Sequence, residues 1–248
     1  MKLRTTPVSG PHDIQAFFDQ LAPHYVDCHG EADSLLQYRL GMIEALLADC
    51  GRSVLLEIGC GTGLHLFALA EAFEHSIGTD LSPGMIAAAD TLRQQHPRAG
   101  HISLRVDAAE TLATVAPDSA DVVLCVGAFE HMPDKRAVLG QVWRVLKPGG
   151  SFICLTPNGD HPWYRLAPWL GLATRHLSSD HFLGRTLLGR LLAVAGFQLH
   201  TLNGWTFVPR GDMPWLWAGL MTLADGLGRR WGLVTLRGGL CCRAIKPR

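Results

Sequence analysis

The sequence lacks several features that would assign the protein to a well-defined class. Its 248 residues contain no run near the roughly 18 consecutive apolar residues that a membrane span needs. The opening stretch, MKLRTTPVSGP, carries basic side chains with no apolar segment behind them, so no signal peptide is expected. Lys plus Arg equal Asp plus Glu at 22 each, which leaves no excess charge to bind a nucleic-acid backbone. We therefore expect a cytoplasmic protein with no transmembrane span and no nucleic-acid partner.

The cysteines lack the spacing of a metal site. None belongs to a Cys-x-x-Cys pair, and an odd count of seven in a chain of this length is typical of reduced thiols. Cys241 and Cys242 are adjacent, but neighbouring side chains of a strand point to opposite faces, which argues against shared ligation. No metal site is predicted. The seven cysteines are Cys28, Cys50, Cys60, Cys125, Cys154, Cys241 and Cys242.

Apolar residues make up 48% of the chain, enough for a sizeable core, and the length predicts one domain over residues 1–248. From residue 53 on, continuous apolar runs alternate with helical patterns. This alternation is typical of a parallel sheet covered by helices on both faces. We therefore predict an α/β fold with a doubly wound, mostly parallel sheet. Strands are predicted at 53–58, 76–79, 101–106, 121–126, 151–156, 197–202 and 233–245. Helices are predicted at 13–21, 32–49, 64–73, 137–146, 184–195 and 214–231, and a further helix is predicted to begin at Pro83.

A glycine-rich loop follows the first predicted strand. Gly59, Gly61 and Gly63 let the main chain approach a ligand closely at the start of a helix. Residue 64 is Leu, where a dinucleotide-binding loop would carry a third Gly or Ala, and this disfavours NAD and FAD. A tight strand-to-helix turn without a ligand is the alternative.

Two carboxylates end the next two strands, at the edge where doubly wound sheets bind their ligands. Asp80 is placed to accept hydrogen bonds from two ribose hydroxyls, or else to partner the N-terminus of the following helix. Ser82 and Pro83 predict the start of that helix. Asp107 is placed to accept from an adenine amino group while the Ala108 amide reaches the ring. A turn or cap role is the alternative for Asp107.

Together these segments resemble a known family. Residues 54–63 (VLLEIGCGTG) are similar to motif I of the class I S-adenosylmethionine (SAM)-dependent methyltransferases, and residues 79–85 (TDLSPGM) to their second motif. Residues 121–134 and 144–150 match later motifs in the right order. The resemblance reaches small-molecule enzymes of quinone biosynthesis and of secondary metabolism. It implies SAM as the cofactor and a Rossmann-like seven-stranded sheet. The implied segments are a helical lid at 1–50, a SAM-binding core at 51–156 and a substrate-side half at 157–248.

The resemblance also implies roles for single residues. Glu57 would bind the amino group of the methionine moiety, and Val126 would lie near the same moiety. Asp80 would hold the ribose, and the three glycines would let the cofactor lie against backbone. Leu81 or Met85 would flank the adenine, while Asp107 and Ala108 would read its edge. The implied cofactor-binding set is therefore Glu57, Gly59, Gly61, Gly63, Asp80, Leu81, Met85, Asp107, Ala108 and Val126.

Two residues are candidates for the chemistry. Methyl transfer is an in-line displacement, which needs a base only if the acceptor must lose a proton. His131 follows the fourth strand, where the acceptor should lie, and is the candidate base. Packing against the cofactor loop or capping the next helix is its alternative. Tyr25 ends the segment FDQLAPHY, which resembles the family's lid, and it closes over the cofactor, steers the acceptor, or packs as a buried aromatic.

Aromatic residues gather in two inserts, 157–180 and 204–231, where this fold builds its substrate pocket. They predict a small aromatic or hydrophobic acceptor, methylated on O, N or C. The same side chains fit a peripheral membrane contact or a homodimer face. Two other functions stay open, namely an oxidoreductase with a nucleotide cofactor on a related sheet and a non-catalytic SAM-binding or assembly protein. The aromatic residues are Trp163, Tyr164, Trp169, Trp205, Phe207, Trp215 and Trp217.

Overall fold

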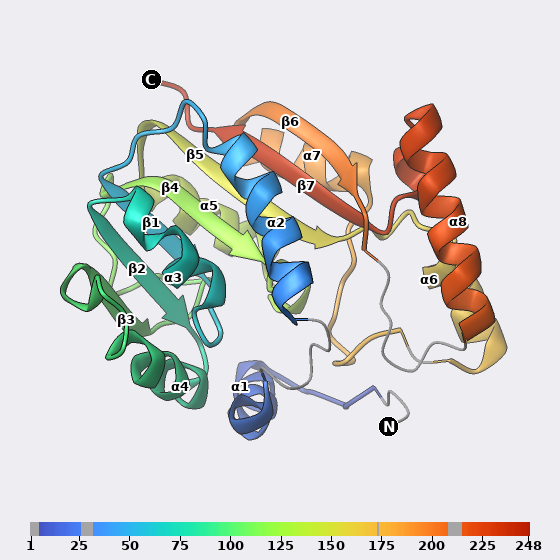
Figure 1. Cartoon of the computed structure of the whole chain (residues 1–248), viewed down its shortest axis with the longest axis horizontal. Helices are drawn as coiled ribbons and strands as arrows, with labels where there is room; N and C mark the ends of the chain where they lie inside the picture. Colours follow the sequence, from blue (N-terminus) through green and yellow to red (C-terminus); the bar gives the residue numbers. More distant parts are fainter. Residues whose placement is uncertain (1–4, 26–31, 173, 208–214) are drawn as a thin grey trace.

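The computed structural model describes residues 5–25, 32–172, 174–207 and 215–248 (Figure 1). Seven strands form one sheet in the order β3-β2-β1-β4-β5-β7-β6. The first five strands are parallel, and β7 runs antiparallel to both of its neighbours. The predicted doubly wound, mostly parallel sheet is confirmed. The strands are β1 (Val54–Ile58), β2 (His75–Asp80), β3 (Ile102–Val106), β4 (Ala120–Val126), β5 (Leu146–Pro157), β6 (Gln198–Trp205) and β7 (Gly239–Ile245).

Helices cover both faces of the sheet. Successive residues of β1 are buried on opposite sides, with Leu56 in one apolar cluster and Leu55 in the other. Buried side chains of α5 and α7 complete the first cluster, and those of α2 and α3 complete the second. The core therefore lies in two layers, which explains the continuous apolar runs of the strands. The helices are α1 (Pro11–Leu21), α2 (Ala32–Leu46), α3 (Leu64–Leu69), α4 (Pro83–Arg93), α5 (Lys135–Val145), α6 (Trp163–Leu166), α7 (Arg185–Val194) and α8 (Trp215–Trp231).

The N-terminal helices occupy different places. Ile43 of α2 and Leu47, which follows it, are fully buried in the second cluster. Residues 32–46 therefore form part of the helical layer on the sheet. In contrast, α1 lies beyond the carboxyl ends of the parallel strands (Figure 1). Of the predicted helical lid, only residues 5–25 therefore lie where they could cover the carboxyl ends of the parallel strands.

The last strand begins later than its apolar pattern predicts. Residues 234–236 form a short 3-10 helix, and β7 starts at Gly239. The fully buried Asn158 donates through Nδ2 to the carbonyls of Val234 (2.9 Å) and Arg237 (2.8 Å). These bonds hold the backbone in a turn, so tertiary contacts override the local strand preference.

The cysteines of β7 point to opposite faces, as expected. Cys241 belongs to one apolar cluster and Cys242 to the other. Cys242 is in register with Cys154 on β5, which in turn pairs with Cys125 on β4. Hydrogen bonding to these two thiols, together with burial, raises the pKa of Cys154 well above its usual range. Cys154 is therefore an unreactive thiol packed in the core at neutral pH.

Within the described ranges, no helix is both long and apolar enough to cross a bilayer. The same part of the chain holds no cluster of three His, Cys, Asp or Glu side chains arranged to bind a metal ion.

Candidate active site

The glycine loop connects β1 to α3 in left-handed backbone conformations. Gly59, Gly61 and Gly63 have φ angles of +63°, +54° and +82°. A Cβ atom on Gly59 would stand 2.5 Å from the Cβ of Ala128. The loop is thus pressed against the segment that follows β4, and glycine is required both for the backbone angle and for the close approach.

Asp80 ties this loop to the start of α4. Its Oδ2 accepts from the amide of Gly61 and its Oδ1 from the amide of Ser82, each at 2.9 Å. Burial raises the pKa of Asp80 above its ordinary value, although the two hydrogen bonds oppose that shift. Each oxygen keeps a further lone pair, so the carboxylate can still accept from a diol. Ser82 caps α4 as predicted, because its Oγ accepts from the Met85 amide at 3.0 Å.

The carboxylate of Asp107 is hydrogen-bonded within the loop that follows β3. The two oxygens accept from the amide of Ala113 (3.1 Å) and from the amide and hydroxyl of Thr114 (both 2.7 Å). This is the arrangement that a turn-forming residue has. A role of Asp107 and the adjacent Ala108 toward adenine stays a prediction. Leu81 is half-buried and Met85 fully buried beside the same edge.

Four buried polar atoms near the glycine loop have no hydrogen-bond partner within the described residues. They are Oε2 of Glu57, Oγ1 of Thr62, Nε2 of His65 and Nε of Arg39. The other oxygen of Glu57 lies 3.5 Å from Nδ1 of His65. Because an unpaired buried polar group is destabilising, such a set indicates groups that bind a polar ligand. Val126 ends β4 and is buried in the same sheet face as Leu124.

Tyr25 lies over the glycine loop. Its ring carbon Cε1 is 3.5 Å from where a Cβ of Gly61 would stand. Burial raises the pKa of Tyr25 to about 12, and the negative charges of Asp80, Glu130 and Glu57 add to the shift. The phenol therefore stays protonated at neutral pH and can donate a hydrogen bond. Tyr25 thus connects the N-terminal segment to the glycine loop, and its role as a lid residue stays a prediction.

Arg39 is the cation that faces Tyr25. Burial lowers the pKa of its guanidinium, while Tyr25 and Glu130 oppose that shift. The guanidinium lies 5.5 Å from the ring centroid of Trp205 on β6, a cation–π arrangement. A positive charge thus stands close to Tyr25 and Glu130.

His131 is hydrogen-bonded to a buried carboxylate. Its Nδ1 lies 2.7 Å from Oδ1 of Asp180, which is fully buried. The other Asp180 oxygen accepts from the amides of His176 (3.0 Å) and Leu177 (2.9 Å). Phe18 of α1 packs edge-to-face on the imidazole at 5.3 Å. The structure therefore fixes the orientation of His131 from two sides.

Opposing effects set the pKa values of this pair. Burial lowers the pKa of His131, but the hydrogen bond and charge of Asp180 and the charge of Glu130 outweigh it. The net pKa of His131 lies above 6.5. Burial likewise raises the pKa of Asp180, and the bond to His131 outweighs it, so Asp180 stays ionised. With Nδ1–H donating to Asp180, the lone pair of Nε2 is the atom that can accept a proton.

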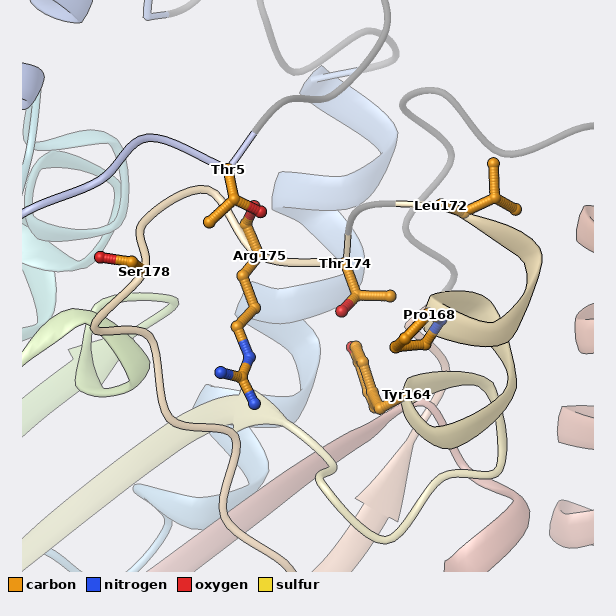
Figure 2. Close-up of a pocket in the computed structure, with 7 residues that line it drawn as sticks. All are labelled: Thr5, Tyr164, Pro168, Leu172, Thr174, Arg175 and Ser178. Carbon is orange, nitrogen blue, oxygen red and sulfur yellow. The ribbon is translucent and has the colours of Figure 1, made fainter.

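A cavity of about 450 Å³ is lined in part by the loop that leads to Asp180 (Figure 2). One wall is apolar and comes from α6 and the residues after it. The opposite wall carries hydroxyls and one guanidinium. Residues 5–8 close it by pairing with residues 175–178, with Thr6 donating to the His176 carbonyl at 2.8 Å and accepting from the Ser178 amide at 2.9 Å. The lining residues are Thr5, Tyr164, Pro168, Leu172, Thr174, Arg175 and Ser178.

The predicted aromatic pocket is only partly present. Tyr164 lines the cavity. Trp163 packs between α6 and α8, and Trp205 is buried in the second core cluster. Trp169 is 91% exposed. Trp163 anchors α6 against α8, and Trp205 of β6 is part of the core between the sheet and α2. The side chains of Trp215 and Trp217 lie outside the described residues.

Three residues at this site were not predicted. Arg39 falls on the buried face of α2, three residues after Leu36 and four before Ile43, so helical periodicity alone could have singled it out. Asp19 of α1 accepts from the amide of Gly84 at 2.9 Å and so docks α1 on the start of α4. Asp180 is 49 residues from His131, and the sequence carries no signal for that contact.

Comparisons with known proteins agree with this geometry. Residues 56–154 match the family model described as a methyltransferase domain. The ubiquinone biosynthesis O-methyltransferase of Idiomarina loihiensis is 35% identical over 178 residues, which cover 70% of this chain and 68% of that protein. The protein of the same name from Cupriavidus pinatubonensis is 29% identical over 216 residues, covering 83% of this chain and 84% of its own length.

The fold is also found among solved structures. A geranyl diphosphate C-methyltransferase from Streptomyces coelicolor A3(2), in complex with Mg²⁺, geranyl diphosphate and S-adenosyl-L-homocysteine (SAH), resembles the chain with a TM-score of 0.67. The two are 14% identical, and the match covers 97% of this chain and all of the other. At this identity the likeness concerns the fold alone.

Proposed function

Because the chain belongs to the class I SAM-dependent methyltransferases, we propose that it methylates a hydroxyl oxygen of a small aromatic acceptor. The observation that carries the proposal is the His131–Asp180 pair beside the glycine loop. A phenol must lose its proton as the methyl arrives, and a buried imidazole oriented by a carboxylate is suited to take it. The names of the two relatives, both O-methyltransferases, support the same acceptor atom.

The residues of the loop fit SAM, which supplies an electrophilic methyl group when bound. The unpartnered Oε2 of Glu57 is placed to accept from the ammonium of the methionine moiety. We assign Arg39 to its carboxylate, because Arg39 is the buried cation at the glycine loop. The free lone pairs of Asp80 are left for the ribose hydroxyls. Leu81 and Met85 would provide the apolar contact for the adenine.

His131 then acts as the base. Its Nδ1–H donates to Asp180, so Nε2 accepts the proton of the acceptor hydroxyl, and the imidazolium that forms is stabilised by the buried carboxylate. Tyr25, which stays protonated, orients ligands from the lid side by donating a hydrogen bond. Most of the acceleration comes from holding the oxygen in line with the methyl.

Methylation of 3,4-dihydroxybenzoate in the presence of SAM tests this function, with methoxy products identified by mass spectrometry. His131→Asn is expected to slow the reaction about 100-fold or more while the affinity for SAH stays nearly unchanged. His181→Asn is the matched control, because His181 directly follows Asp180 on its loop and its side chain is exposed. A full rate in His131→Asn, or methylation of amines but of no hydroxyl, would contradict the proposal.

The pH profile gives a second readout. The base must be neutral to work, so kcat rises with pH and levels off above a midpoint higher than 6.5. Asp180→Asn removes the charge that raises the pKa of His131, so the midpoint moves to lower pH while the plateau falls. An unchanged midpoint in Asp180→Asn would show that the titrating group is not His131.

A further inference from the structure

The cavity lined by the loop that leads to Asp180 has two chemically different walls. Tyr164, Pro168 and Leu172 form an apolar and aromatic wall. Arg175, flanked by hydroxyls, stands on the other side, and Figure 2 shows its side chain extending opposite Tyr164. A cavity of about 450 Å³ has the size of small-molecule pockets. Its walls suit a ligand with a flat apolar body and one polar end.

The guanidinium of Arg175 is not used by the fold. Among the residues that the structure describes, no carboxylate pairs with it, and its side chain is exposed to the cavity. The carboxylate nearest in sequence belongs to Asp180, and it is already hydrogen-bonded to His131 and to two backbone amides. A planar cation with five donors and no partner is a receptor for a carboxylate or phosphate.

The backbone under Arg175 is nevertheless held in place. Its carbonyl accepts from Oγ1 of Thr5 at 3.1 Å, and the next carbonyl, of His176, accepts from the Thr6 amide. Val8 donates to Oγ of Ser178 at 3.0 Å. A binding residue on a preorganised loop loses less entropy when its ligand arrives.

The same loop leads directly to the reaction centre. Ser178 lines the cavity, and Asp180, two residues on, orients His131. On the opposite wall, Tyr164 feels the charge of Glu130, the residue before His131, which together with burial raises the pKa of its phenol. His176, the residue after Arg175, lies with its ring centroid 6.3 Å from that of His131. A ligand bound at Arg175 can therefore extend toward the imidazole of His131.

We propose that Arg175 selects acceptors that carry an acidic group, so that the substrate is an aromatic hydroxyl compound with a carboxylate or phosphate on its far side. This inference rests on the proposed function, since it places the acceptor of that reaction in the cavity. Arg175 binds the acid, the apolar wall takes the ring, and the hydroxyl reaches His131. No bond to Arg175 forms or breaks during the reaction.

Two catechols of the same shape test the proposal. 3,4-Dihydroxybenzoate carries a carboxylate at neutral pH, and 3,4-dihydroxybenzamide is neutral. Binding of each is measured by calorimetry to the protein saturated with SAH. The benzoate is expected to bind more tightly, and Arg175→Ala to weaken it about 10- to 100-fold without changing the affinity for the amide. Arg175→Lys keeps the positive charge but loses the two parallel N–H donors of the guanidinium. Its affinity for the benzoate is expected to lie between those of the unaltered protein and Arg175→Ala.

Arg190→Ala is the matched control, because it removes one exposed positive charge from α7 outside the cavity. Equal affinities of the unaltered protein for the two catechols, equal losses for both in Arg175→Ala, or no binding of the benzoate would overturn the proposal. Selective binding without any methyl transfer would leave Arg175 as the acid receptor and defeat the proposed O-methylation. Methylation of both catechols with equal kcat/KM would defeat the role of Arg175 and leave the O-methylation standing.

Discussion

At the scale of one residue, Arg39 is the buried cation that the proposed function assigns to the carboxylate of SAM. Its guanidinium is buried, which lowers its pKa, and its Nε has no partner in the described residues. Replacing such a charge by an apolar side chain of similar length is often neutral or stabilising. The unpartnered Nε of this buried guanidinium is best explained by a ligand that pairs with it.

We therefore expect Arg39→Met to weaken SAH binding about 10- to 100-fold while the ligand-free protein unfolds at the same or a higher temperature. Calorimetry and thermal unfolding, with and without SAH, measure the two effects. Arg52→Met is the control with the reverse result, because Arg52 donates to the Leu47 carbonyl and lies over Phe73, a purely structural site. If Arg39→Met bound SAH normally and melted early, Arg39 would be structural too.

The residues that could be predicted from sequence are those whose position follows from a strand end. The glycine loop, Asp80 and the Ser82 cap all lie directly after strands that their own apolar runs identify. Asp107 was predicted in the right place, but the sequence could not show that Ala113 and Thr114 take up its carboxylate. Asp180 could not be found, since its contact with His131 depends on how a loop after β5 folds back.

Elements were predictable where local pattern and tertiary contacts agree. All seven strands and the main helices lie near their predicted places. β5 begins at Leu146 instead of residue 151, although Lys147–Gly150 has the composition of a turn. The Gly149 amide donates to the Lys246 carbonyl, and Leu146 pairs with Ala120, so neighbouring strands extend β5 into the turn. Such pairings depend on the neighbouring strands of the assembled sheet, so the local sequence pattern does not predict them.

The extended segment before α1 is an element that no periodicity predicts. It pairs as a short parallel bridge with residues 176–178, on the loop that also carries Asp180. Separately, α1 is docked on α4 through Asp19 and touches His131 through Phe18. The two attachments predict separable functions, one for the acceptor side and one for the cofactor side.

Deleting residues 1–9 is accordingly expected to lower kcat/KM for the acceptor about 10- to 100-fold, because the loop that orients Asp180 and lines the cavity loses its partner. The affinity for SAH should stay within about twofold, since Asp19 and Tyr25 remain. Ser178→Ala, which removes the side-chain bonds to Val8, should produce a smaller loss of the same kind. A parallel loss of SAH affinity would mean that the segment only supports the fold.

At the scale of the whole molecule, the balanced charge hides a strong asymmetry. Residues 157–248 contain eleven Lys and Arg but four Asp and Glu, so their net charge is +7 and that of residues 1–156 is −7. Two of the four acids, Asp180 and Asp225, are buried in hydrogen bonds. The cavity therefore opens in a positive half of the molecule, which attracts anionic ligands from a distance.

This field predicts a dependence on salt that is separate from the local contact with Arg175. Raising the ionic strength from 0.01 to 0.15 M shortens the screening length from about 30 to about 8 Å. KM for 3,4-dihydroxybenzoate should rise severalfold over this range, and KM for the neutral amide should stay constant. In Arg175→Ala the KM for the benzoate starts higher but should keep most of its salt dependence, because ten of the eleven basic residues remain. Initial rates measured at four or five salt concentrations decide the matter. If the amide showed the same salt dependence as the benzoate, salt would be acting on the protein's conformation, and the positive half would have no part in drawing acidic acceptors to the site.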